Sequence, residues 1–563
     1  MNALSIGTSA LQTAQKAMAL VGQNIANATT PGYHRQSVNF TNSVTGAQGS
    51  GVDIASITRY TAAPVRTAIV SGNANDGYYA AQLATRRQIE TTLAGGESGV
   101  GDRLDSLFNQ VEQLTSQPDS LASRRAIITA AGSVAQQLNS TAGDIDRLRA
   151  DINKQVTATV TEVNDYATKI ADLNNRILTT ENRGNPTNDL RDQRDQLIDE
   201  LSKRVDIKTV EQPSGEINVL ASGAAIVVGQ YANKFQAAND ATGNVVITQQ
   251  GVAQPVTFKS GTLGALVQDH NTTIPAIRAR LDGVAGQLIQ RANQVQATGL
   301  GSSGPLASTS GTNAVSDPTV PLNTAALPFA VQAGTLTVSV TNSNVIPSTR
   351  TNTAIAINPA TQSLNDIATA LGAVPGLQAS VDPTTNTLQI QGQAGFTFDF
   401  AGRDSVPAGS GTVANSDTSN LLSALGVNGL FVGSNAAGIA VNPAVSSNPG
   451  LLAASRTGLP GDGTNLERLG AIRDQQAFGT RTLTEEFADI AATLGTDINN
   501  ISDQQTAQSG TLQNLNNQEL SVTGVDTNEE LLHLLDFQRQ IQGASKYLSV
   551  VNTALDSLLA ILP

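Results

Sequence analysis

The chain has 563 residues, of which 39% are hydrophobic, enough for several cores and for about three or four ordinary domains. Its 33 Lys and Arg residues against 46 Asp and Glu give a formal charge of -13. This charge opposes contact with phosphates, so neither a nucleic acid nor an anionic membrane is expected as a partner. Because the chain has no cysteine, disulfides, zinc-thiolate sites and thiol nucleophiles are excluded.

The ends of the chain differ from the rest in composition. The first 52 residues contain no Asp or Glu, although the protein is acidic elsewhere. The first cation is Lys16, and Gln and Thr interrupt the apolar runs around it, so no cleaved secretory signal is expected. No run of about 18 apolar residues occurs, so no membrane-spanning helix is expected either.

The first predicted element is a heptad helix over residues 3–28, which ends at a turn. Small side chains at three of its four d positions would allow a partner helix to approach closely. Pro31 and Gly32 fit the centre of a type II turn, and extended chain is predicted from Tyr33 to Phe40. The a positions are Leu4, Leu11, Met18 and Ile25, and the d positions are Gly7, Ala14, Val21 and Ala28.

The middle of the chain alternates between helical and β-rich composition. Residues 75–205 are predicted to be mainly helical, short strands are predicted near 205–260, and helix returns near 262. Residues 301–460 contain no Lys and no Glu, and runs such as "TLTVSV" and "FTFDF" predict strands. One short helix is predicted there, capped by Ser363 and Asp366, and charged helical sequence resumes after 461.

A second heptad pattern runs to the C-terminus. A capping box of Thr527 and Glu530 is predicted to start this helix. The residues after 524 are net acidic, whereas the first 52 residues contain basic side chains and no acidic ones. The two end helices thus carry opposite net charge, which suggests that they pair. Apolar seams of this kind either bury themselves within one domain or join separate copies, and their position at the termini favours association or disorder. The heptad positions are Leu534, Phe537, Ile541, Ala544, Leu548, Val551, Leu555, Leu558 and Leu562.

No motif for catalysis, metal binding or cofactor binding occurs in the sequence. His34, His270 and His533 are far apart in the chain, and each is interpreted as an ordinary polar residue. The stretch "NDLRDQRDQLIDE" is interpreted as a solvated helix face with interleaved charges, although paired carboxylates for acid–base chemistry are the alternative. The prediction is therefore a protein without catalytic residues, metal or cofactor.

Both ends of the chain resemble one known family. "ALQTAQKAMALVGQNIANATTPGYHRQSV" is similar to the N-terminal signature of bacterial flagellar rod, hook and hook-associated proteins, and "LLHLLDFQRQIQGASKYLSVVNTALDSLLAI" is similar to their C-terminal signature. "NDLRDQRDQLIDELSKRVDI" and "GTLGALVQDHNTTIPAIRARLDGVAGQLI" most resemble the members found at the junction of hook and filament. The N-terminal assembly motif would then comprise Asn24, Ile25, Asn27, Thr30, Pro31, Gly32, Tyr33, Arg35 and Gln36.

The resemblance implies a structural function at the surface of a bacterium. The helix seam formed by Leu4, Leu11, Met18, Leu534, Phe537, Ile541, Leu548, Val551, Leu555 and Leu558 would pack subunits around the export channel. The implied partners are copies of the chain in a ring, the hook protein, the second junction protein (hook-associated protein 3) and an export chaperone at the C-terminal helix. Export would use the flagellar type III apparatus, which leaves the protein extracellular.

The expected fold class is multidomain α+β with nested layers. Residues 1–55 with 525–563 would form a terminal coiled-coil domain, residues 56–300 with 461–524 a mainly helical domain, and residues 301–460 a β-rich outer domain. A hook or distal rod subunit would share both end motifs and is the nearest alternative. An adhesin or a cell-wall hydrolase is the alternative from another class.

Overall fold

The computed structural model describes residues 2–45, 48–94, 99–183, 185–404, 412–413 and 415–560. These residues form two compact units. The first unit comprises Met1–Thr85, Asp151–Asn271 and Ile498–Pro563, and the second comprises Arg86–Ala150 and Thr272–Asp497. Helices and small antiparallel sheets occur in both, as expected for a multidomain α+β protein.

The first unit contains both ends of the chain. Its two sheets have the strand orders β3-β4-β5-β6 and β7-β8, and β1 and β2 form a separate antiparallel ribbon. Its elements include α1 (Asn2–Ala26), β1 (Gln36–Thr45), β2 (Gln48–Arg59), α5 (Asn188–Arg204), β3 (Ile207–Glu211), β4 (Ile217–Ala221), β5 (Ala224–Val228), β6 (Tyr231–Ala232), β7 (Phe235–Asn239), β8 (Val245–Gln249), α6 (Gly261–Gln268) and α13 (Thr527–Leu559).

Four further elements have residues in both units. They are α2 (Ala63–Ala94), α4 (Leu121–Glu181), the π-helical turn η1 (Asp269–Thr273) and α12 (Leu483–Thr523).

The second unit holds the β-rich part of the chain. Its sheets have the strand orders β11-β10-β14, β12-β13-β9 and β15-β16. Its elements are α3 (Val100–Thr115), α7 (Ile274–Ala297), β9 (Ser308–Ser310), β10 (Gly334–Asn342), β11 (Thr349–Ile357), α8 (Leu364–Gly372), β12 (Leu377–Val381), β13 (Leu388–Gly392), β14 (Phe396–Asp399), α9 (Leu421–Leu425), β15 (Phe431–Val432), β16 (Ala440–Val441), α10 (Pro443–Ser447), η2 (Pro449–Leu451), α11 (Thr464–Gly470) and η3 (Ala471–Asp474).

Several local predictions from the sequence are confirmed. The strands predicted near 205–260 form β3, β4 and β5, and the cap of α8 uses Ser363 and Asp366 as expected. The mainly helical region predicted over 75–205 includes α4, whose buried apolar face in the first unit is formed by Val156, Val163, Ile170 and Ile177. Asn174 on this helix donates to the carbonyls of Ile217 and Gly229 and accepts from the Ile217 amide, which joins α4 to the sheet.

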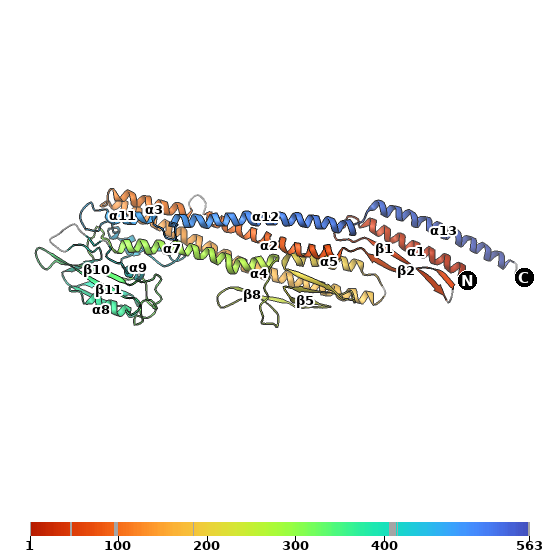
Figure 1. Cartoon of the computed structure of the whole chain (residues 1–563), viewed down its shortest axis with the longest axis horizontal. Coiled ribbons are helices and arrows are strands. Elements are labelled where there is room, and N and C mark those ends of the chain that lie inside the picture. Colours follow the sequence, from red (N-terminus) through yellow and green to blue (C-terminus); the bar gives the residue numbers. More distant parts are fainter. Residues whose placement is uncertain are drawn as a thin grey trace. The chain divides into compact units, whose positions relative to one another are not determined.

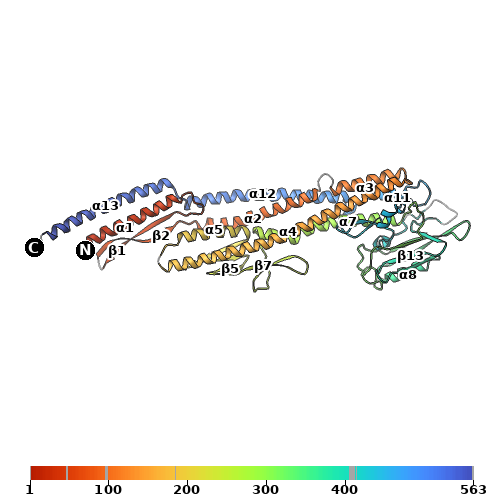
Figure 2. The ribbon, with the colours of Figure 1, turned by 180° about the vertical axis from the view of Figure 1, so that it is seen from behind.

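The two terminal helices of the chain pair antiparallel. α1 and α13 lie side by side in the first unit, and the two termini lie at the same end of the pair (Figure 1). The β1–β2 ribbon lies along α1 in the view from behind (Figure 2). The ribbon was only partly predicted, since the sequence indicated extended chain up to Phe40 and gave no signal for β2.

A glycine allows the close approach of α1 to α13. A Cβ atom on Gly7 would lie 2.6 Å from Cδ2 of Leu548 and 3.1 Å from Cδ1 of Tyr547. Gly7 is a d position of the N-terminal heptad and Leu548 is an a position of the C-terminal one. The predicted pairing of the two end helices through small d residues is therefore confirmed at this point.

We predict that Gly7→Val destabilises the α1–α13 pair by about 1–3 kcal/mol, because the added side chain would overlap Leu548. Hydrogen exchange of the α13 amides in the full-length chain measures this loss as reduced protection. Gly22→Val is the matched control, since nothing lies within 4 Å of a Cβ at this position of the same helix. Equal protection in the two variants would contradict the proposed packing.

Candidate assembly interface

The N-terminal signature forms a closed hydrogen-bond network around Asn24. Asn24 is completely buried, and its Nδ2 donates to the Gln36 carbonyl at 2.8 Å and to Oε2 of Glu530 at 3.0 Å. Its Oδ1 accepts from the hydroxyl of Tyr33 at 2.8 Å and from the Gln36 amide at 3.1 Å. Each of its polar atoms is satisfied, so Asn24 fixes the chain where α1 gives way to β1.

The turn after α1 has the predicted geometry. The Tyr33 amide donates to the Thr30 carbonyl at 3.2 Å, and Gly32 has a φ of +74°, which favours glycine. Thr30 Oγ1 donates to Oδ1 of Asn27, and Gln196 of α5 donates to the Pro31 carbonyl at 2.7 Å. The turn is therefore fixed both to itself and to α5.

Arg35 joins the turn to the bend between α12 and α13. Its backbone amide donates to the Thr523 carbonyl at 2.8 Å. Its guanidinium donates to Oε1 of Glu530 at 2.7 Å and lies 3.0 Å from Oε1 of Glu529. Because the Glu530 side chain is only 2% exposed, this ion pair and the bond from Asn24 are needed to hold a buried charge. We call Asn24, Arg35 and Glu530 the buckle.

The predicted capping box of α13 is wrong. The helix starts at Thr527, but Asp526 accepts from the amide of Asn528 at 2.8 Å and from that of Glu529 at 3.4 Å. Glu530 does not cap the helix, because Asn24 and Arg35 bind its carboxylate. A capping box is predicted only from residues close together in sequence. Here the glutamate that would complete it binds two residues from the opposite end of the chain instead.

The charged stretch of α5 is also different from its prediction. Asp192 and Arg194 are buried, so the stretch is not a solvated face. Nδ1 of His34 lies 2.8 Å from Oδ1 of Asp192, and the Nε of Arg59 lies 2.7 Å from the same oxygen. Gln36 accepts from Asn188 at 2.9 Å and donates to Asp189 at 3.4 Å. The charged side chains of α5 thus contact the end of β2 and the turn after α1 instead of being hydrated.

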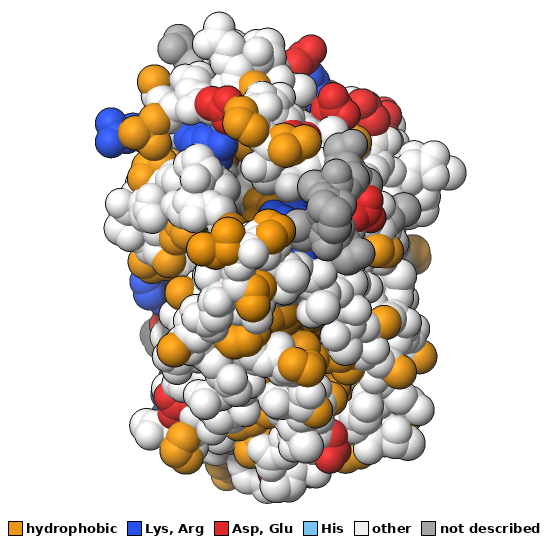
Figure 3. All heavy atoms as spheres, turned by 90° about the vertical axis from the view of Figure 1, so that its left-hand side faces the viewer, with side chains coloured by type: hydrophobic (Ala, Val, Ile, Leu, Met, Phe, Trp, Pro, Cys, Tyr) orange, Lys and Arg blue, Asp and Glu red, His pale blue; other side chains and the backbone are white. Residues whose placement is uncertain are grey.

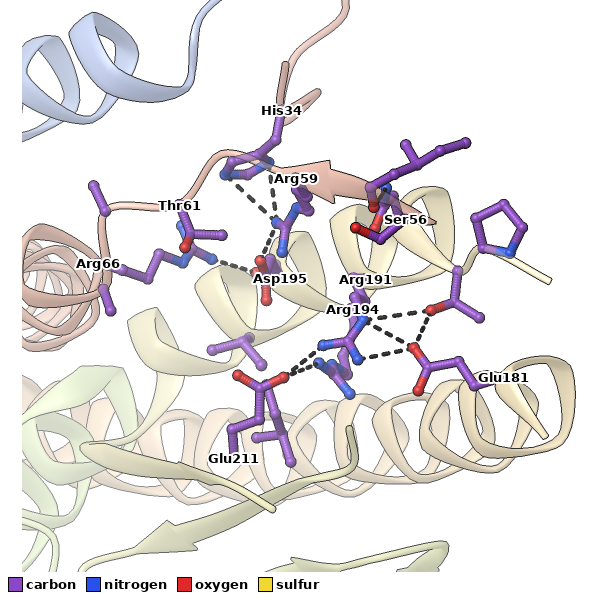
Figure 4. Close-up of a pocket in the computed structure, with 18 of the residues that line it drawn as sticks. His34, Ser56, Arg59, Thr61, Arg66, Glu181, Arg191, Arg194, Asp195 and Glu211 are labelled. Carbon is purple, nitrogen blue, oxygen red and sulfur yellow. Dashed lines mark hydrogen bonds and ion pairs between the residues drawn. The ribbon is translucent and has the colours of Figure 1, made fainter. Parts of the chain in front are cut away.

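A groove of about 1000 Å³ lies beside these charges (Figure 4). Arg59 pairs with Asp195, and the Arg66 guanidinium lies 2.8 Å from Asp199 and 3.7 Å from Glu519. Arg66 therefore connects α2, α5 and α12 within the first unit. Figure 4 shows Arg59 directed toward Asp195, and Arg191 between Glu181 and Glu211.

The two aspartates that pair with Arg59 and Arg66 have opposite pKa shifts. Burial raises the pKa of Asp199 from 3.8 to about 6, and the charges of Asp195 and Glu519 add to this although Arg66 opposes it. Burial would also raise the pKa of Asp195, but the guanidiniums of Arg59 and Arg66 outweigh it and lower that pKa below its ordinary value. The two shifts thus differ because two guanidiniums act on Asp195, whereas Asp199 has Arg66 on one side and the carboxylates of Asp195 and Glu519 on the other.

The predicted seam is half-buried by the pairing of α1 with α13. Leu4, Leu11, Met18 and Ile25 are half-buried on α1, as are Leu534, Phe537, Ile541, Leu548 and Val551 on α13. Phe537 also meets Phe40 of β1 edge to face, with ring centroids 6.2 Å apart. Leu555 is 38% exposed, and the side chain of Leu558 and all of Leu562 lie outside the described residues.

A second apolar stripe on α13 was missed in the sequence. Its side chains are about half exposed or more, up to 65% for Leu532 and 63% for Val550, and one of them, Tyr547, also lies beside Gly7 of α1. The doubled leucines of "LLHLL" were a signal for it, because a two-helix seam needs only one leucine of each pair. We call this set the outer stripe: Leu531, Leu532, Leu535, Tyr547 and Val550.

The other two histidines have no common site. His270 is buried on η1 with its Nδ1 2.9 Å from Asn271, whereas His533 is exposed and lies 3.6 Å from Glu529. Within the described parts of the chain, no group of three metal-ligating side chains lies together, and no helix is long and apolar enough to span a bilayer.

Comparison with known proteins identifies relatives of both the end region and the helical region. The model of the flagellar hook-associated protein FlgK helical domain matches residues 86–312. The model of the flagella basal body rod protein matches residues 4–34. The second match contains all of α1 except its first two residues, together with the turn at residues 30–33.

Longer alignments with individual proteins agree with these matches. Two proteins named flagellar hook-associated protein 1, from Salmonella typhimurium and Salmonella typhi, are each 25% identical to this chain over 405 residues. The alignment covers 67% of this chain and 65% of theirs, so the match spans just under two thirds of these relatives. In fold, the chain resembles the flagellar hook junction protein FlgK from Burkholderia pseudomallei, with a TM-score of 0.50, 16% identity, and coverage of 81% of this chain and 100% of that one.

We predict that Glu530→Ala destabilises the first unit by about 1–3 kcal/mol, because it leaves Asn24 and Arg35 without their buried acceptor. Urea unfolding followed by the fluorescence of a probe on α13 measures the change. Glu529→Ala is the control, since this exposed neighbour contacts the same arginine and its removal is expected to have little effect. A similar loss in both variants would show that the buckle has no special role.

We predict that Asp199→Asn becomes progressively more stable relative to the parent chain as the pH rises from 4 to 7. Between these values Asp199 in the folded parent retains a proton that the unfolded chain releases, so the free energy of unfolding of the parent falls as the pH rises. Asparagine does not titrate, so the variant does not lose stability in this way. Thermal unfolding at several pH values measures the difference. Asp195→Asn should instead run parallel to the parent over this range, because its folded pKa is lowered and its carboxyl is ionised in both the folded and the unfolded chain. Parallel pH profiles for all three proteins would be inconsistent with the assigned shifts.

Proposed function

We propose that this relative of flagellar hook-associated protein 1 is a structural subunit of the bacterial flagellum, which forms the junction between hook and filament and allows the filament to assemble on the hook. The outer stripe of α13 is the observation that carries the proposal. Large apolar side chains exposed on a terminal helix, here in two groups at Leu531–Leu535 and Tyr547–Val550, form a surface for association. The similarity to flagellar hook-associated protein 1 supplies the kind of assembly.

The proposed assembly buries the outer stripe against a neighbouring copy. Covering five half-exposed large apolar side chains gains roughly 1 kcal/mol each, before the costs of association are subtracted. This is too little to hold two free chains together at low concentration. Assembly would therefore depend on many copies meeting at the growing end of the structure, as a ring requires.

The buckle gives the signature residues a role in this proposal. It ties the signature turn to α13, so the stripe is presented from a fixed helix. Assembly motif residues Asn24, Thr30, Gly32 and Arg35 would then act by positioning the terminal pair rather than by touching a neighbour. The division into a terminal, a helical and a β-rich outer domain, at 55, 300, 460 and 524, remains part of the proposal.

The proposed partners follow the same plan. They are copies of the chain in a ring, the hook protein, hook-associated protein 3 and an export chaperone at α13. The protein would leave the cell through the flagellar type III apparatus without a cleaved signal and remain extracellular. No enzymatic activity is proposed, because the proteins that this chain resembles are named as flagellar hook-associated proteins.

The alternatives differ in cellular phenotype. We propose deleting the gene in its own organism, imaging the surface and assaying flagellin in the medium. Complete hooks without filaments and with shed flagellin would support a junction protein. Missing or truncated hooks would indicate a hook or rod subunit, and intact filaments would leave the adhesin or the cell-wall hydrolase.

We predict that the double variant Leu532→Asp, Leu535→Asp restores neither filaments nor its own incorporation in this deletion strain. Its purified form should keep the circular dichroism of the parent, since both side chains are about half exposed or more. Immunoblotting of isolated flagella measures incorporation. Gln513→Asp, an exposed change on α12, is the control and should complement. Incorporation of the double variant at the parent level would contradict the role of the outer stripe.

A further inference from the structure

An apolar tip ends the β10–β11 hairpin of the second unit. Ile346 is 100% exposed, and Val345 and Pro347 beside it are also exposed. Turns are usually built from polar residues and glycine, so three consecutive apolar residues at a tip are unusual. An apolar projection of this kind is typical of a contact with another molecule.

Hydrogen bonds hold the base of the tip in place. The Asn344 amide donates to Oδ1 of Asn342 at 2.9 Å, and its Nδ2 donates to the Ala394 carbonyl at 3.1 Å. The Ser343 amide donates to the Gly395 carbonyl at 2.9 Å. Because the tip is anchored to the turn between β13 and β14, little conformational entropy would be lost on docking.

The same unit contains a hollow in which such a tip would fit. It lies between α3 and the α11–η3 segment and has a volume of about 520 Å³. Its apolar lining comes from Ala471, which is exposed, and from the edges of Phe108 and Leu466, which are almost fully buried. The volume is within the range of sites that bury several apolar side chains.

The charges around the two features are complementary. Glu112, Glu467 and Asp474 line the hollow, whereas its Arg473 is engaged by Asp105 at 3.1 Å. The hairpin from 334 to 357 contains no acid and one base, Arg350. An acidic rim around an apolar lining therefore faces, in a second copy, an apolar tip on a hairpin without negative charge.

The end of this unit shows the same separation of charge (Figure 3). Most charged side chains in that view gather in the upper part, on the side of α3 and α11 in Figure 1. Hydrophobic side chains are spread over the lower part, on the side of the β-rich sheets, with few charges between them. The two surfaces are thus different in character.

We propose that the tip Val345–Pro347 of one copy docks into the hollow between α3 and α11 of a second copy. A contact between two different surfaces of the same chain is heterologous, and repeated around an axis it closes a ring. This contact involves other residues than the outer stripe. It rests on the proposed function, because a neighbouring copy is present only if the chain assembles into a ring.

The absence of cysteine from the chain allows a direct test. We would place Ile346→Cys and Ala471→Cys together in the chain, isolate flagella from a strain carrying only this variant, and oxidise them. Both positions are exposed, so folding should be unchanged. The expected result on a non-reducing gel is a ladder of cross-linked multimers of this chain.

A matched control uses another turn of the same unit. Thr384→Cys, at the exposed turn between β12 and β13, replaces Ile346→Cys and is paired with the same Ala471→Cys. Multimers with the control at the level of the test pair, or no multimers although the chain is present in the flagella, would overturn the contact alone. Absence of the parent chain from isolated flagella would overturn the proposed function and this contact with it.

A second variant tests the apolar character of the contact. In isolated flagella that carry Ala471→Cys alone, the introduced thiol is expected to be protected from maleimide. Adding Ile346→Asp should abolish this protection, whereas adding Ile346→Leu should preserve it. Because Ile346 is fully exposed, neither change should alter the unfolding of the purified chain. Protection that is unaffected by Ile346→Asp would contradict the docking of the tip.

Discussion

The terminal part of this structure depends on one buried carboxylate. Glu530 cannot remain charged inside the protein unless donors surround it, and Asn24 and Arg35 supply them from the other end of the chain. This requirement brings the two ends of the chain together. The antiparallel pairing of α1 and α13, the turn at Gly32 and the bend at Thr523 all meet at this point.

The pairing divides α13 into two faces with different uses. One face packs on α1, where Gly7 admits Leu548, and this accounts for the predicted heptad. The outer stripe is left over, since no second helix of the described chain covers it. A helix that satisfies one partner within the chain and retains apolar surface for another is well suited to a subunit that folds first and assembles afterwards.

Local signals were sufficient to predict much of the fold, but not the contacts of the site. The heptads, the turn at Gly32, the strands near 205–260 and the cap at Ser363 depend on neighbours in sequence, and they were predicted correctly. The solvated face of α5 was wrong because periodicity cannot distinguish water from the buried partners of Asp192 and Arg194. The capping role of Glu530 was wrong because Asn24, 506 residues away, competes for it. The ribbon strand β2 was missed, since the glycines of "GAQGSG", which runs into the start of the strand, indicate a loop.

The central claim is that the outer stripe of α13 lies against a neighbouring copy in the flagellum. Because the chain has no cysteine, Val550→Cys provides a single reporter on this surface, and its rate of maleimide labelling can be compared between the purified chain and isolated flagella. Fast labelling of the free chain with strong protection in flagella is the predicted result. Equally fast labelling in both states would contradict the claim, because the stripe would then remain open to solvent after assembly.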